Sequence, residues 1–209
     1  SQASGTSSVA LGGAAAATEV ATVALADGIA SGPNAFAFGG EASGVNAIAL
    51  GRNAHATAFS SFAAGAATAA GTYSRAMGLN ARTGTSTLPS VALGHNVATN
   101  GGVAIGRDVS SSSGGVALGR NVDARLGSFV FGDNASSAEI LTTLPNSFAA
   151  RAQSFWFGRG SLYEFNKGLL NTSTGAFLSN GGTWGGASCR EGKHQFAVVN
   201  ARAVPAGVR

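Results

Sequence analysis

Few residues of this sequence have the types and spacing that catalysis or metal binding requires. The three histidines, His55, His95 and His194, lie far apart, and no Cys or carboxylate stands near them at the spacing of metal ligands. The single cysteine, Cys189, has no His–Asp context, so a structural or inert thiol is the simpler reading. We therefore predict a non-enzymatic protein with no catalytic residues, no metal and no cofactor.

One polar pattern does suggest binding. Arg52, Arg107 and Arg120 each follow a Gly and precede an Asn or Asp, and His95 occupies the same slot. If the segments that carry them stack, these side chains form a basic column. The planar guanidinium of Arg suits anionic groups, so the predicted binding residues for an anionic glycan are Arg52, His95, Arg107 and Arg120. The alternative is a solvated edge that only keeps the protein soluble.

The composition excludes several classes of protein. Charged residues are 11% of the chain, hydrophobic residues are 44%, and Gly accounts for 32 of 209 positions, which argues against disorder. The net charge of +4 comes from Arg residues spread along the chain, so we do not predict nucleic-acid binding. No apolar run approaches the ~18 residues of a membrane span. No signal peptide is visible, and we expect a processed or excised piece.

The elements that would position the basic column are internal repeats. A phrase of large apolar residue, Ala, large apolar residue, Gly recurs about every 12 to 16 residues, as VALG at 91, VAIG at 103 and VALG at 116. Between copies come Gly-x-Asn junctions such as Gly94-His95-Asn96, which favour turns because Gly and Asn tolerate positive φ. Units this short are typical of the coils of a β-solenoid, not of helical repeats.

The alternation within each copy predicts which side chains fill the solenoid. We expect a roll of short two-strand coils whose narrow interior holds the large residues Val91, Leu93, Val103, Ile105, Val116 and Leu118. The Ala residues would then form an outer face that permits a close neighbour. A roll this thin is marginal as a monomer, so we predict self-association into a homotrimer through the Ala face.

The repeat pattern ends near Ser137. The segment 138–147 contains no Gly and one Pro, and large aromatic residues gather after it. We predict two domains, a β-roll over 1–137 and an aromatic-rich β cap or connector over 138–209. A solenoid requires such a cap to cover its last edge.

The ten copies with their Gly-x-Asn junctions resemble the YadA-like head repeats of trimeric autotransporter adhesins over about residues 7 to 137. The resemblance implies a left-handed parallel β-roll, three chains wound side by side, and adhesion to a surface. The stretch TTLPNSFAARAQSFWFG is similar to the connector that precedes the self-cleaving chaperone of phage tail fibres and endosialidases. Ser188, Arg190 and Lys193 match the opening motif of that chaperone, with Cys189 in place of its Asp.

These observations lead to two hypotheses on function. The first is an extracellular trimeric fibre protein for adhesion or receptor binding, on a phage tail fibre or a bacterial cell surface, with itself and an anionic surface glycan or host receptor as partners. The second is a purely structural spacer of such a fibre. An endosialidase-like enzyme is a distant third, because the sequence has only 9 acidic residues and they are mostly scattered.

Overall fold

The computed structural model describes residues 1–134, 138–152, 170–171, 177–178 and 184–185. These residues form strands, turns and loops, and none of them is helical, so no helix in this part of the chain could span a membrane. The chain divides into two compact units, Ser1–Ala152 and Gln153–Arg209. In the second unit, β18 (Leu170–Asn171), β19 (Phe177–Leu178) and β20 (Trp184–Gly185) form a small antiparallel sheet.

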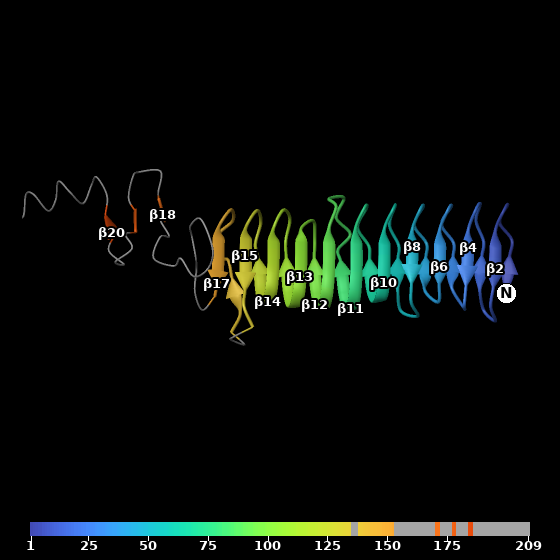
Figure 1. Cartoon of the computed structure of the whole chain (residues 1–209). Helices are drawn as coiled ribbons and strands as arrows, with labels where there is room; N and C mark the ends of the chain where they lie inside the picture. The colour runs from blue at the N-terminus through green and yellow to red at the C-terminus, as the bar shows by residue number, and fades with distance from the viewer. Residues whose placement is uncertain (135–137, 153–169, 172–176, 179–183, 186–209) are drawn as a thin grey trace, which may run out of the picture. The chain divides into compact units, whose positions relative to one another are not determined.

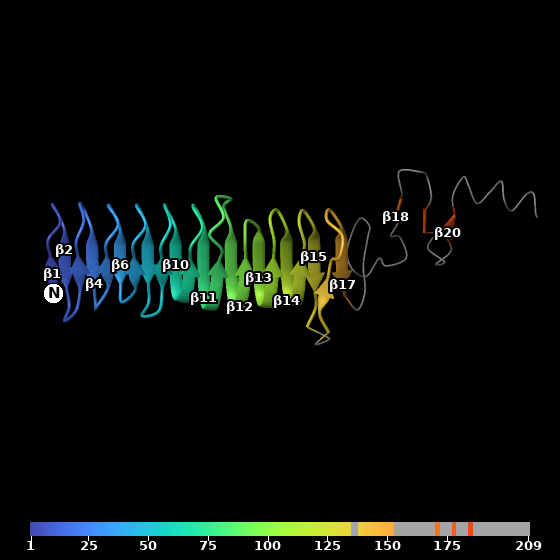
Figure 2. The ribbon, with the colours of Figure 1, turned by 180° about the vertical axis from the view of Figure 1, so that it is seen from behind.

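The first unit is a parallel β-solenoid of about ten coils, as the repeats predicted, and its coils stack into a straight rod (Figures 1 and 2). At the usual spacing of neighbouring strands it is roughly 48 Å long. The strands of the early coils are short: β1 (Gln2–Ala3), β2 (Val9–Leu11), β3 (Ala16–Ala17), β4 (Val23–Leu25), β5 (Ile29–Ala30), β6 (Phe36–Phe38), β7 (Glu41–Ala42), β8 (Ile48–Leu50) and β9 (His55–Ala56).

Later coils have longer strands. The two short strands of each coil merge into one strand that continues through the glycine of the repeat, where φ is positive. These strands are β10 (Phe62–Ala69), β11 (Arg75–Thr83), β12 (Val91–Thr99), β13 (Val103–Ser111) and β14 (Val116–Ala124). The solenoid ends with β15 (Phe129–Gly132), β16 (Ile140–Leu141) and β17 (Phe148–Arg151).

The turn chemistry of the junctions is confirmed at some copies and not at others. Gly94 and Asn96 both have positive φ, and so do Gly119 and Asn121. At the junction that contains Arg52, Gly51 has positive φ but Asn53 does not. At the Gly-x-Asn junctions, the left-handed asparagines therefore belong to the coils with one continuous strand.

The predicted orientation of the repeat is wrong. The central Ala of each copy between residues 23 and 118 faces the interior and is fully buried, as Ala92, Ala104 and Ala117 illustrate. The large residues on either side of it point outward, and Ile105 is 37% exposed. The Ala face is therefore the lining of the solenoid and cannot be the surface of self-association.

The narrow interior explains the inversion. The strands of successive coils stack into two rows that enclose the interior. Small side chains from both rows already fill it, including Ala24 and Ala37 from one row and Ala30 and Ala42 from the other. Two rows of Val or Leu would need a wider coil. The sequence does indicate the true orientation, because Arg75 stands in its copy of the repeat at the position that Val91 has in the next copy. An unpaired charge at an inward position would be strongly destabilising.

Hydroxyl groups complete the interior. A buried Ser or Thr comes directly before many of the strands that carry the repeated phrase. Its hydroxyl donates a hydrogen bond to the carbonyl three residues earlier, as Ser61 Oγ does to the Ala58 oxygen at 2.8 Å. On the other row, Ser111 Oγ lies 2.7 Å from Thr99 Oγ1 and donates to it. These bonds satisfy polar groups that would otherwise be costly to bury.

The solenoid continues beyond the predicted boundary at residue 137. Ile140 pairs with Val122, and Phe148 pairs with Phe129, so both strand rows extend past the loop between β15 and β16. The compact unit ends after Ala152. The FAAR stretch of β17 is another copy of the repeat, with Arg151 in place of Gly, and that substitution hid it from a search for the phrase.

Candidate functional site

The structure brings three of the four predicted binding residues together. His95, Arg107 and Arg120 are direct neighbours in register on β12, β13 and β14. All three follow the glycine at which their strands bend. Arg52 lies apart from them in the turn between β8 and β9. The residues in register with His95 on the two preceding strands are Leu79 on β11 and Ala66 on β10. These two apolar residues separate the coil of Arg52 from the other three basic residues.

Polar partners hold the two arginines of this column. Arg107 Nε lies 3.4 Å from Asp108 Oδ2, in an exposed ion pair, and Arg120 Nη1 donates to Asn134 Oδ1 at 2.7 Å. Further along, Arg151 Nε lies 2.9 Å from Asp133 Oδ1. Carboxylates therefore offset part of the positive charge that the sequence pattern predicted.

A ladder of amide groups runs beside the basic column. Asn80 Nδ2 donates to Asn96 Oδ1 at 3.2 Å, and Asn96 Nδ2 donates to Asp108 Oδ1 at 2.7 Å. All three residues have left-handed backbone, which turns their side chains along the solenoid axis. The hydrogen bond from Asn96 is the main reason why the pKa of Asp108 lies below its ordinary value. Nearby positive charges act in the same direction and partial desolvation opposes them.

This ladder leads to a prediction on pH. Asn96→Gly keeps a residue that tolerates left-handed backbone but removes the donated hydrogen bond, so the pKa of Asp108 should rise towards its ordinary value. Because folding lowers this pKa, ionised Asp108 stabilises the fold above the unfolded pKa, and that contribution is lost as pH falls through the folded value. A carboxyl NMR titration measures the shift. An unchanged pKa for Asp108 would contradict the assignment.

The large residues that were predicted to fill the interior instead form an outward surface. The first strand row forms one continuous parallel ladder from β2 to β17. Two columns of outward side chains follow it, which we call the apolar face. The first column is Val9, Val23, Phe36, Ile48, Phe62, Arg75, Val91, Val103, Val116, Phe129 and Phe148. The second is Leu11, Leu25, Phe38, Leu50, Ala64, Met77, Leu93, Ile105, Leu118, Phe131 and Ala150.

Many of these apolar side chains are substantially exposed. The exposed fraction is 63% for Leu11, 50% for Phe38 and 69% for Phe148. Scattered exposed hydrophobic residues are ordinary in soluble proteins, but contiguous apolar patches are typical of interaction surfaces. The constant small residue between two variable large ones is the sequence signal that could have located this face.

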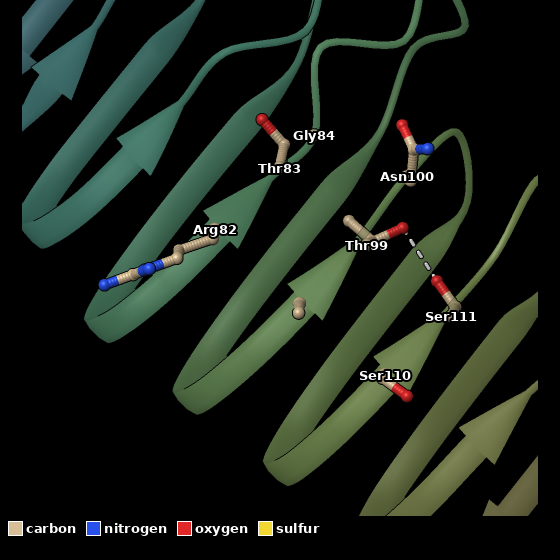
Figure 3. A pocket seen from close by; sticks show the side chains of 8 residues that line it. Arg82, Thr83, Gly84, Thr99, Asn100, Ser110 and Ser111 are labelled. Atoms are coloured by element: carbon tan, nitrogen blue, oxygen red, sulfur yellow. Dashed lines mark hydrogen bonds between the residues drawn. The ribbon is translucent and has the colours of Figure 1, made fainter.

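The second strand row carries a different surface. Its outward side chains in the middle of the solenoid, which we call the polar row, follow one register: Glu41, His55, Thr68, Arg82, Ala98, Ser110 and Asp123. Two open grooves lie along this row, and Arg82 lines both. Figure 3 shows the groove on the β12 and β13 side, where Arg82 extends along its strand away from Thr83.

Within the part of the chain that the structure describes, no group of three His, Cys, Asp or Glu residues could hold a metal ion. Ser188, Cys189, Arg190, Lys193 and His194 lie outside the described residues. In comparisons with known proteins, no family model, no curated protein and no solved structure matches this chain.

Proposed function

We propose that this chain is a non-enzymatic segment of an extracellular trimeric fibre that serves adhesion or receptor binding, on a phage tail fibre or a bacterial cell surface. The observation that carries the proposal is the apolar face, a continuous ladder with large exposed side chains in most of its coils. The resemblance to YadA-like head repeats adds the left-handed winding, the number of chains and the adhesive role. The β-rich cap over the C-terminal residues belongs to the same proposal.

Self-association through the apolar face fits the geometry of a repeat protein. Both columns have the same register in every coil, so copies lying side by side can match coil for coil along the rod. Burying a Leu or Phe side chain contributes about 2 kcal/mol, and the face offers many of them. Association through this face therefore stabilises coils whose interior holds only small side chains, Ala, Ser, Thr and a few Val.

Receptor binding in this proposal uses the basic column at the edge of the apolar face. His95 lies two residues after Leu93, and Arg107 lies two residues after Ile105, so the column begins where the second apolar column ends. A trimer presents three such columns. Weak binding of an anionic glycan at each would then gain affinity from avidity without further contacts.

The test is binding to heparin. Replacing Arg52, Arg107 and Arg120 together by Gln should abolish retention while leaving the protein folded, because these side chains lie outside the solenoid interior. Attraction between exposed charges is screened within about 8 Å at physiological ionic strength, so retention of the unmodified protein should fall steeply with salt. Unchanged retention of the triple variant would show that the column is only a solvated edge.

A structural spacer is the second candidate, and the uniform stacking of the coils favours it. Identical pairings from β2 to β17 give a straight rod suited to holding another domain away from its base. A spacer would still form the trimer but would bind none of the glycans in an array. An adhesive fibre should bind acidic members of that array.

A further inference from the structure

Arg82 is a cation without a partner on the polar row. Its side chain makes no hydrogen bond or ion pair with any residue that the structure describes, and the residue is exposed. Its register neighbours are Thr68 on β10 and Ala98 on β12, whose side chains are much shorter. The guanidinium therefore extends beyond its neighbours as a ridge between the two grooves.

The acidic residues of the same row are engaged elsewhere. Glu41 Oε2 lies 3.2 Å from His55 Nδ1, and Asp123 Oδ1 accepts a hydrogen bond from Ser110 Oγ at 2.7 Å. Both carboxylates stand three strands from Arg82, which corresponds to roughly 14 Å along the ladder. No carboxylate of this row is therefore close enough to neutralise Arg82.

Hydroxyl and amide groups surround this cation. Asn53, His55, Thr68 and Asn80 line the groove on the β9 side, together with Ala66 and Leu79. The side chains of Asn53 and Thr68 make no hydrogen bond with other described residues, so their polar groups are free to bind a ligand. On the other side, Asn100 and Ser110 line the groove, whereas Thr99 and Ser111 bond to each other (Figure 3).

We propose that Arg82 and the groove on its β9 side bind an acidic saccharide, with the guanidinium on the saccharide carboxylate. A single guanidinium matches a singly charged carboxylate and holds it through two parallel N–H donors. The free amide and hydroxyl groups of Asn53 and Thr68 bind sugar hydroxyls. An acidic protein segment fits less well, because the anchors of protein interfaces sit in well-packed, fully desolvated pockets and this groove is open.

The site is compatible with the proposed trimer. Arg82 belongs to the second strand row, whereas the apolar face is formed by the first row, and buried Ala and Thr side chains lie between them. Copies packed on the apolar face leave the polar row open. The inference deepens the proposed adhesive role and rests on it, but it concerns residues other than the basic column.

The experiment measures binding of trigalacturonic acid and 3′-sialyllactose to the full chain by calorimetry, with neutral lactose as the uncharged probe. We expect binding of at least one carboxylated saccharide, none of lactose, and at least a tenfold loss in Arg82→Gln, since a charge-assisted pair contributes about 1.5 kcal/mol or more. Thr68→Asp places a carboxylate beside Arg82 and should abolish binding as well. The matched control, Arg125→Gln, changes an exposed arginine just after β14 that belongs to neither surface, and it should bind like the unmodified protein.

Each result separates this inference from the proposed function. Absence of binding to both carboxylated saccharides, or equal binding by Arg82→Gln, overturns the site even if heparin retention and trimerisation are intact. Loss of heparin retention in the triple arginine variant with unchanged saccharide binding supports both surfaces. Saccharide binding by a protein that neither trimerises nor binds heparin supports this site and contradicts the fibre proposal.

Discussion

Gly106→Ala should unfold the middle of the solenoid. Gly106 has a φ of +139°, where residues with a Cβ are strained, and an added Cβ would collide with the carbonyl oxygen of Gly119 on the next coil. The collision is with backbone, so no side chain can move to relieve it. We expect a loss of at least about 3 kcal/mol in the free energy of unfolding, measured by urea denaturation with far-UV circular dichroism.

Gly114→Ala is the matched control. Gly114 also has positive φ, +70°, but the nearest atoms to an added Cβ are 3.8 Å away, on Gly127. Only the conformational cost remains, so the loss should be about 1 kcal/mol. If the two variants lost the same stability, the close approach of neighbouring coils at Gly106 and Gly119 would not be what requires glycine there.

The double variant Ile105→Asp/Leu118→Asp should dissociate the proposed trimer without unfolding the chain. These adjacent residues belong to the outward second column of the apolar face, so charges there oppose association but do not enter the interior. With about 2 kcal/mol lost for each apolar side chain, association should weaken at least about 100-fold. Light scattering should then give the 20.4 kDa monomer, with an unchanged strand spectrum.

Thr68→Asp is the control for this variant, because it adds a charge on the polar row and should remain trimeric. A stable 20.4 kDa monomer for the unmodified protein would contradict the proposed association. Collapse of the strand spectrum in the double variant at every concentration would mean that these residues support the fold itself. A substitution in the interior should have a different effect from the double variant. Ala104→Asp buries an unpaired charge and should unfold the chain.

The sequence by itself determined the architecture of the first unit. Copies of one phrase at a nearly constant step require stacked coils, and the Gly-x-Asn junctions mark where the chain bends. The alignment of His95, Arg107 and Arg120 follows directly, because residues at the same offset from the repeated phrase fall into register when coils stack. Arg52 lies outside this column because the coils between it and His95 carry Ala66 and Leu79 at that position.

Only the tertiary structure decided which side of each strand is the interior. Alternation shows that Ala92 and Leu93 point to opposite sides, but it does not show which side is enclosed. The distance between the two strand rows of a coil decides that, and it leaves room for Ala but not for Leu. The same holds for Arg82, which no motif marks. Its lack of a partner among the described residues depends on which residues of other coils the register places beside it.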